Sequence, residues 1–294
     1  MMNKIKIWLH ATRPKTLPAS VIPVLTGTAL AVYINKIDAA TFIITLIEAI
    51  LIQLITNFVN EIYDYKRGVD TAERTGPTRA VASGAISVKT MTIVSAAMTF
   101  VTFALGLYLV FGKGGGIFIL SIGIFSLILA YLYTAGPKPI SYLGLSEIFC
   151  FLFFGVFAVT GTFYLQTHTL TIEAILTSFG PGFLSVNILG VNNIRDIQTD
   201  IQAGKMTLAV KLGRRNAILL YIIFNVLAFV TPFVLTIIIK NYWILLPVIC
   251  FPFSIYLIKN LLNHSGSELN KVLAGTGQLL VMYGVLSSIS FLMI

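Results

Sequence analysis

Hydrophobic residues along this chain are arranged in nine long runs separated by shorter polar segments. Each run is close to the ~20 residues that a helix needs to cross the hydrocarbon part of a bilayer. Because lipid cannot hydrogen-bond the backbone, such runs most simply form helices, in which the backbone N–H and C=O groups bond to one another. The pattern therefore predicts an all-α polytopic membrane protein with nine transmembrane helices, built as a single domain over residues 1–294. The predicted spans are 17–34, 41–62, 90–111, 116–135, 143–165, 171–191, 217–239, 241–259 and 273–294.

The placement of Lys and Arg supports this count. With nine spans and a cytoplasmic N-terminus, 17 of the 20 basic residues fall in inner segments, and only Lys36, Lys113 and Lys240 fall in outer ones. Short cytoplasmic loops carry such an excess of basic residues. The bias predicts an integral protein of a bacterial inner membrane, with any site in the long inner loops facing the cytoplasm.

Composition narrows the function further. Hydrophobic residues make up 57% of the chain and charged residues 11%, against roughly 25% charged residues in soluble proteins. The basic loops account for the net charge of +9, so the lipid bilayer is the expected partner, no nucleic acid is needed and no obligate protein partner is evident. Three His and two Cys, far apart in sequence, indicate neither a zinc or haem site nor a disulfide.

Two polar clusters stand at the ends of apolar runs, and each begins one of the two longest polar loops, 63–89 and 192–216. Carboxylates beside lipid are costly and need a partner. The cluster members recur at intervals of three and four, which places them on one helix face, and Asn192, Asp196 and Asp200 should form one stripe on a continuing helix. The first cluster contains Asn57, Asn60, Glu61, Asp64, Lys66 and Asp70, and the second contains Asn192, Arg195, Asp196, Asp200 and Lys205.

The two clusters lie four spans apart, which indicates two four-helix halves followed by a ninth helix. Clustered hard oxygen ligands beside cations favour Mg²⁺ holding a phosphorylated ligand. We therefore predict that both clusters face one cytoplasmic cavity. The alternative is that the acids only form surface salt bridges with neighbouring basic residues.

Motifs along most of the chain resemble the UbiA superfamily of membrane prenyltransferases, and within it the 1,4-dihydroxy-2-naphthoate polyprenyltransferase (MenA-type) branch. Glu61 stands where that superfamily usually has Asp. The resemblance rests on the residues Ala11–Pro18, the block from Asn57 to Gly84, Tyr133–Pro137, Tyr142–Leu145, Asn192–Asp200 and Gly204–Lys205.

The resemblance implies a UbiA-like bundle, a polyprenyl diphosphate donor, an aromatic acceptor and Mg²⁺ as cofactor. Asp64, Asp196 and Tyr133 are then the expected catalytic residues, because carboxylate-bound Mg²⁺ neutralises the leaving diphosphate and an aromatic face favours the allylic cation. The expected metal ligands are Asn60, Glu61, Asp64, Asp70, Asn192, Asp196 and Asp200. The expected substrate-binding residues are Asn57, Asn60, Lys66, Arg74, Arg79, Asn192, Arg195, Lys205, Arg13, Tyr131 and Tyr142.

The MenA-type branch implies prenylation and decarboxylation of 1,4-dihydroxy-2-naphthoate, which gives demethylmenaquinol in menaquinone biosynthesis. A different acceptor, 4-hydroxybenzoate or homogentisate, stays open, and so does a transporter, although transporter sites lie near the bilayer midplane. A CDP-alcohol phosphotransferase is disfavoured because the chain has no Asp-Gly pair. The prenyl tail needs an apolar wall, for which the Phe-rich run 149–157 is a candidate.

Overall fold

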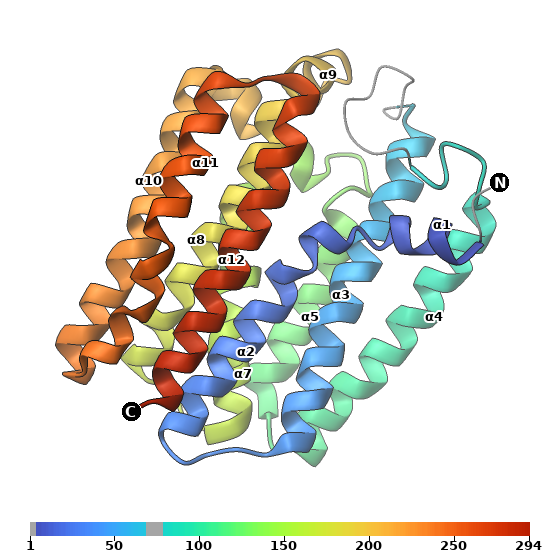
Figure 1. Ribbon diagram of the computed structural model, residues 1–294. Coiled ribbons are helices and arrows are strands. Elements are labelled where there is room, and N and C mark those ends of the chain that lie inside the picture. Colours follow the sequence, from blue (N-terminus) through green and yellow to red (C-terminus); the bar gives the residue numbers. More distant parts are fainter. Residues whose placement is uncertain (1–3, 69–78) are drawn as a thin grey trace.

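A computed structural model describes residues 4–68 and 79–294 of the chain. All regular elements in these ranges are helical, and the long helices stand side by side in one bundle (Figure 1). The predicted all-α class is confirmed. The α-helices are α1 (Lys4–Ala11), α2 (Pro18–Tyr33), α3 (Ala39–Lys66), α4 (Val88–Leu107), α5 (Gly116–Leu132), α6 (Ser146–Phe151), α7 (Ala158–Thr167), α8 (Ile172–Arg195), α9 (Ile197–Gln202), α10 (Leu208–Ile239), α11 (Phe251–Asn263) and α12 (Leu269–Leu292).

Short 3-10 and π segments join or extend several of these helices. Two of them, η2 and η4, are π-helical and continue a longer helix without a break. The segments are η1 (Pro14–Thr16), η2 (Tyr108–Gly112), η3 (Ile140–Tyr142), η4 (Leu152–Phe157), η5 (Tyr242–Cys250) and η6 (Gly266–Glu268).

Every predicted apolar run coincides with a helix of the bundle. Within the described ranges, seven helices are long and apolar enough to cross a membrane, and the pair Ile5–Thr16 and Pro18–Tyr33, bent by 56°, makes an eighth. Helix α5 is apolar but has only 17 residues. These helices support an integral membrane protein. The count of nine, which includes α5, and the cytoplasmic N-terminus stay predictions.

The predicted loop 192–216 is the main error in the expected element boundaries, because most of it is helical. Helix α8 continues to Arg195, α9 follows, and α10 begins at Leu208, capped by the Thr207 hydroxyl, which accepts a hydrogen bond from the Val210 amide. Helix α10 is kinked at Gly213, whose φ of 74° suits glycine. Hydrophobicity did not reveal these turns because they carry charged residues beyond the apolar run.

The central core lies where α2, α8, α10 and α12 meet, and its residues include Ile22, Leu184, Phe229 and Tyr283. Tyr283 also corrects a backbone defect. Pro232 in α10 has no N–H to donate to the Ala228 carbonyl four residues earlier. The Tyr283 hydroxyl donates to that carbonyl at 2.9 Å instead. The proline is thus tolerated inside a buried helix because a neighbouring helix supplies the missing donor.

Helix α8 and the segment η4 approach each other closely through Gly155 and Gly182. A Cβ at Gly155 would lie 2.6 Å from the Gly182 Cα atom, which is backbone and cannot rotate away. Small residues at such crossings let membrane helices pack closely.

We expect Gly155→Ala to lower the free energy of unfolding of the purified protein by about 1–3 kcal/mol, the usual cost of overpacking, and so to lower its melting temperature. Gly190→Ala in α8 is the matched control, because nothing lies within 4 Å of its Cβ; equal melting temperatures for the two variants would contradict this packing.

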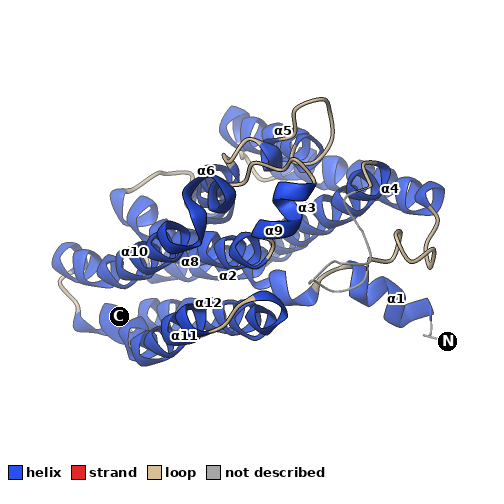
Figure 2. Cartoon of the chain, turned by 90° about the horizontal axis from the view of Figure 1, so that it is seen from above, coloured by secondary structure: helices blue, strands red, loops and turns tan. Residues whose placement is uncertain are grey.

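The two ends of the bundle differ in chemistry. At one end, Asp38 caps α3 and accepts a hydrogen bond from Lys113 at 2.6 Å. Its backbone N–H donates to the side-chain oxygen of Gln166 in α7 at 2.7 Å, so three separate segments are joined there. At the opposite end, which we call the motif end, α3 finishes at Lys66 and α8 finishes at Arg195. Seen from above in Figure 2, α9 lies between α3 and α8 at this end. Both predicted polar clusters are therefore brought to the same end.

Candidate active site

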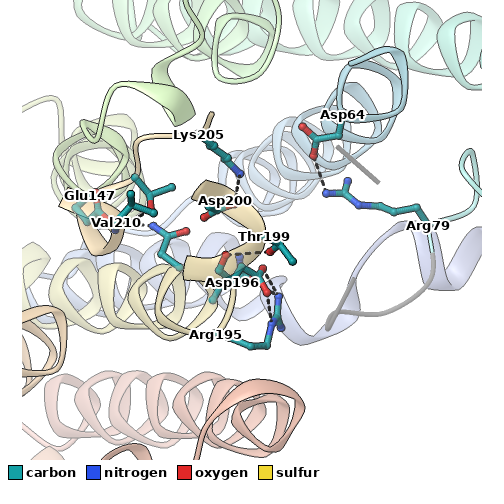
Figure 3. Close-up of polar contacts among 12 residues, drawn as sticks. Asp64, Arg79, Glu147, Arg195, Asp196, Thr199, Asp200, Lys205 and Val210 are labelled. Atoms are coloured by element: carbon teal, nitrogen blue, oxygen red, sulfur yellow. Dashed lines mark hydrogen bonds and ion pairs between the residues drawn. The ribbon is translucent and has the colours of Figure 1, made fainter. Parts of the chain in front are cut away.

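One cavity of about 400 Å³ extends from the motif end into the bundle and is lined by residues of both polar clusters. Ten of the predicted site residues line it: Arg13, Asn57, Asn60, Asp64, Arg79, Tyr133, Asn192, Asp196, Asp200 and Lys205. Figure 3 shows Asp64 approaching from the α3 side and Asp196 and Asp200 from the opposite side. The structure thus places residues of both clusters on one cavity, while the chemical roles of these residues stay predictions.

The cavity face of α3 carries Asn57, Asn60 and Asp64, and neighbouring segments fix each of them. The Asn57 amide donates to the Thr12 carbonyl at 3.0 Å, and Thr134 donates to the Asn60 amide oxygen at 2.7 Å. Asp64 pairs with Arg79 at 2.7 Å, and both side chains are almost fully buried. The helix therefore presents its two amides and its carboxylate in one fixed row.

Glu61 does not share this row. Its side chain is buried, does not line the cavity and accepts a hydrogen bond from the Val81 amide at 3.2 Å. One residue on a helix turns the direction of the side chain by about 100°, which separates Glu61 from Asn60. In this position Glu61 anchors the segment that carries Arg79, and its expected support of the metal stays a prediction.

The second cluster is bent, because α8 ends at Arg195 and α9 begins at Ile197. Asp196 joins them with φ −97° and ψ 8°, so Asn192, Asp196 and Asp200 do not form the predicted stripe on one continuous helix. All three still line the cavity. The bend therefore directs the side chains of α8, of α9 and of the residue between them into the same opening.

Arg195 stabilises this bend from the side that faces away from the cavity. Its side chain is 1% exposed and does not line the cavity. Its Nε and Nη2 atoms donate to the two Asp196 carboxylate oxygens at 2.8 and 2.6 Å (Figure 3). Nη2 also donates to Asn192 at 2.8 Å, and Nη1 donates to Asn270 at 2.7 Å. One guanidinium thus orients two residues of the cluster and ties α8 to α12, while the predicted substrate-binding role of Arg195 stays a prediction.

Asp200 and Lys205 form the remaining edge of the opening. Their side chains lie 3.8 Å apart, and the turn at Gly204, with φ 66°, brings the Lys205 amide back to the Asp200 carbonyl at 2.8 Å. Burial raises the pKa of the Asp200 carboxyl to about 6, although the charge of Lys205 acts in the opposite direction. Binding of a cation at this carboxyl near pH 6 is therefore expected to release a proton.

Other predicted residues lie outside the cavity lining. Lys66 is exposed and lies over the Tyr63 ring, and Tyr131 exchanges a hydrogen bond with Thr99 at 2.8 Å. Tyr142 is half-buried beneath Arg67 and Lys205, whose cations lie 5.0 and 6.0 Å from its ring centre. The predicted contacts of Lys66, Tyr131 and Tyr142 with substrate stay predictions. Asp70 and Arg74 lie outside the described residues.

Sequence reasoning missed several residues of the cavity. Asn193 lines it and donates to Glu147 at 3.0 Å; both side chains are buried, and Glu147 had no expected role. The signal that could have found them is a polar residue within a membrane run. Of the expected phenylalanine wall, Phe151 packs instead on Phe179 and Phe183, while Phe149, Phe153, Phe154 and Phe157 line the cavity.

The residues of the opening fit a hard divalent cation. Asp64 Oδ1 and Asp200 Oδ2 are buried and have no hydrogen-bond partner, which leaves carboxylate oxygens available to a ligand. Beside them are the amides of Asn60 and Asn192. In the described part of the chain no three acidic, His or Cys side chains gather at one point, so these residues would hold Mg²⁺ with few protein ligands and the rest from substrate and water, as Mg²⁺ prefers.

Comparison with known proteins agrees with this geometry. The model of the UbiA prenyltransferase family matches residues 20–282. The chain is similar to a 1,4-dihydroxy-2-naphthoate octaprenyltransferase of Haemophilus influenzae (39% identity, 72% of this chain and 71% of the relative). It is also similar to one of Mycobacterium tuberculosis (31% identity, 95% and 94%).

Among solved structures, the fold is similar to that of a UbiA homolog from Archaeoglobus fulgidus bound to DMAPP and Mg²⁺, with a TM-score of 0.68, 15% identity and coverage of 98% and 99% of the two chains. At this identity the likeness concerns the fold alone. The family match and the two relatives show the family itself. The helical bundle and these matches agree, and the chain belongs to the UbiA prenyltransferase family.

Proposed function

We propose that this prenyltransferase moves a polyprenyl chain from its diphosphate to 1,4-dihydroxy-2-naphthoate with loss of CO₂, giving demethylmenaquinol for menaquinone biosynthesis. The observation that carries the proposal is the single cavity that Asp64 shares with Asp196 and Asp200 and that continues as an apolar channel. The relatives named for this acceptor support the choice of acceptor. Membership of the family favours an enzyme over the transporter.

The diphosphate end of the donor is held at the motif end. Asn60 and Asp64 from one side, and Asn192, Asp196 and Asp200 from the other, would hold Mg²⁺, and Asp70 is proposed to join them. The bound metal would neutralise charge on the leaving diphosphate. Arg79 and Lys205 line the same opening and donate charge-assisted hydrogen bonds to phosphate oxygens. Because Arg79 is paired with Asp64 without a ligand, donor binding and rearrangement of this pair should be coupled.

The acceptor is proposed to enter beside Arg13, whose guanidinium receives the naphthoate carboxylate. Arg13 lines the cavity, and its φ of 52° sets it at the break between α1 and η1. Tyr133, which also lines the cavity, offers an aromatic face to the allylic cation. The alignment of donor and acceptor in one cavity supplies much of the rate.

The bond changes follow from this arrangement. The allylic C–O bond breaks and its electron pair leaves with diphosphate. The ring carbon that bears the carboxylate, made electron-rich by the two hydroxyl groups, then forms the new C–C bond. The C–CO₂ bond breaks, its electrons return to the ring and restore aromaticity. No oxidant or reductant enters, which suits a cavity whose chemistry is carboxylates, amides and cations.

The test is a reconstituted reaction with purified protein in detergent, Mg²⁺, a polyprenyl diphosphate and 1,4-dihydroxy-2-naphthoate. Demethylmenaquinol or its oxidised quinone, CO₂ and diphosphate should appear in equal amounts, and EDTA should stop all three because the carboxylates alone cannot neutralise the leaving group. Excess Mg²⁺ added after EDTA is the control and should restore turnover.

Other outcomes distinguish the acceptor from the reaction. A product that retains its carboxylate would contradict the decarboxylation. Turnover only with 4-hydroxybenzoate or homogentisate would overturn the proposed acceptor while leaving prenyl transfer in place.

We further propose that the motif end faces the cytoplasm of the bacterial inner membrane, as the basic loops predict. A cysteine introduced at Lys66 should then react with a membrane-impermeant thiol reagent only from the cytoplasmic side.

A further inference from the structure

Helix α8 carries two consecutive asparagines near its C-terminal end, Asn192 and Asn193, and both line the cavity. Their amides are held by side chains of opposite hydrogen-bonding character. The Arg195 guanidinium, which can only donate, binds the Asn192 oxygen at 2.8 Å. The Glu147 carboxylate, which accepts, receives the Asn193 N–H at 3.0 Å. The two partners therefore fix the two amides in opposite senses.

This difference leaves the amide oxygen of Asn193 available to a ligand. Among the described residues, the bond to Glu147 is the only hydrogen bond of the Asn193 side chain, whereas the Asn192 oxygen already accepts from Arg195. An amide oxygen has two lone pairs and is a hard ligand. Asn193 also stands three residues before Asp196, a spacing that makes side chains neighbours on a helix surface. Asn193 is thus a neighbour of a carboxylate proposed to hold Mg²⁺.

Glu147 lies outside the cavity lining, so it acts on a ligand only through Asn193. It is buried in the first turn of α6, which packs against α8. In Figure 3 it lies on the far side of Asp200 from Asp64. An ionisable side chain inside a membrane bundle is costly and marks a functional site more often than a packing contact. Its one side-chain partner among the described residues is the Asn193 amide.

We propose that Asn193 supplies an amide oxygen to the Mg²⁺ that holds the donor diphosphate, and that Glu147 is the positioning residue that turns this oxygen toward the cavity. The inference rests on the proposed prenyl transfer and adds one metal ligand and its support to that site. Without the Glu147 acceptor, the amide can rotate by half a turn and present its N–H, which repels a cation. Loss of such a supporting group typically weakens metal binding about 10–100-fold.

The experiment measures binding of geranyl diphosphate to the purified protein in detergent, without acceptor, as the Mg²⁺ concentration is increased. Asn193→Leu keeps the approximate size of the side chain and removes its oxygen, so the Mg²⁺ concentration for half-maximal binding should rise about tenfold or more. Glu147→Leu should raise it to a similar extent. Glu147→Gln should stay within about threefold of the wild type, because the Gln amide oxygen still accepts from Asn193.

Asn187→Leu is the matched control. Asn187 is also a buried asparagine of α8 in an interhelical hydrogen bond, donating to the Tyr221 carbonyl at 3.1 Å, but it does not line this cavity. Its loss should lower the melting temperature and leave the Mg²⁺ requirement unchanged. All variants are compared at a temperature at which their melting curves show them folded. An Asn187→Leu variant that needs as much Mg²⁺ as Asn193→Leu would mean that the effect reports helix packing, and would overturn the proposal.

The double variant Glu147→Leu/Asn193→Leu tests whether Glu147 acts through Asn193. It should need no more Mg²⁺, within about twofold, than Asn193→Leu alone, because residues that act as one unit are not additive. Multiplied effects of the two substitutions, or a loss in Glu147→Gln as large as in Glu147→Leu, would overturn the positioning role. An unchanged Mg²⁺ requirement in Asn193→Leu, or a change confined to the KM of the aromatic acceptor, would overturn the metal-binding role.

The same titrations separate this inference from the proposed function. Absence of turnover with 1,4-dihydroxy-2-naphthoate would reject the proposed acceptor, and the Mg²⁺ titrations would still test Asn193 and Glu147. Mg²⁺-dependent donor binding that none of these variants changes would reject the inference while the transfer reaction stands. Donor binding by the wild type that does not require Mg²⁺ would reject both.

Discussion

Asp64→Asn is expected to reduce prenyl transfer at least about a hundredfold while the protein still inserts and folds. The amide keeps the shape of the side chain but not the charge that holds a divalent cation against diphosphate, and losing one electrostatic contact of this kind typically costs that much or more. Asp196→Asn should be equally damaging, because it faces the same cavity from the second cluster. The measurement is kcat/KM at saturating Mg²⁺, together with Mg²⁺-dependent donor binding.

The matched control is Asp38→Asn. Like Asp64, Asp38 is an aspartate of α3 with a basic partner, in this case Lys113. It caps the N-terminal end of the helix, whereas Asp64 lies near the C-terminal end. Its loss should change stability and leave kcat per folded molecule within about twofold, since no reacting group is near it. Near-normal activity in either Asp64→Asn or Asp196→Asn would show that the acid serves only as the partner of Arg79 or Arg195.

Arg195→Ala is expected to affect both activity and stability. Removing the guanidinium breaks its forked ion pair with Asp196, and loss of one member of a buried pair typically costs about 3–5 kcal/mol. It also frees Asn192 and Asp196 to turn away from the cavity. We expect a lowered melting temperature and a loss of kcat/KM of at least tenfold. Arg195→Lys should recover little, because an ammonium cannot reproduce the forked contact with Asp196.

A readout specific to positioning distinguishes this from simple destabilisation. The Mg²⁺ concentration needed for half-maximal activity should rise in Arg195→Ala, measured at a temperature where the variant is fully folded. Asn270→Ala is the control, since it removes one acceptor of Arg195 and leaves the contacts with Asn192 and Asp196 in place. An unchanged Mg²⁺ requirement in Arg195→Ala would mean that Arg195 contributes only to the packing of α8 against α12.

The sequence by itself determined the membrane class, the helices and the cluster positions. Apolar runs near 20 residues leave few alternatives to helices, because lipid cannot hydrogen-bond the backbone. Residues spaced by three and four share a helix face whatever surrounds them, so the row of Asn57, Asn60 and Asp64 could be predicted. The two clusters lie at the ends of the second and sixth runs, and an even number of spans between them brings both to one end of the bundle.

Only the tertiary structure decided which of these polar residues faces the cavity. Glu61 and Asp64 belong to one motif, yet Glu61 binds the Val81 amide and Asp64 lines the opening. Arg79 and Arg195 both pair with an acid, but only Arg79 reaches the cavity. The physical reason is that a polar side chain near lipid needs a hydrogen-bond or ion-pair partner. For Glu61 and Asp64 that partner comes from another segment, which carries Val81 and Arg79, and only the fold places that segment.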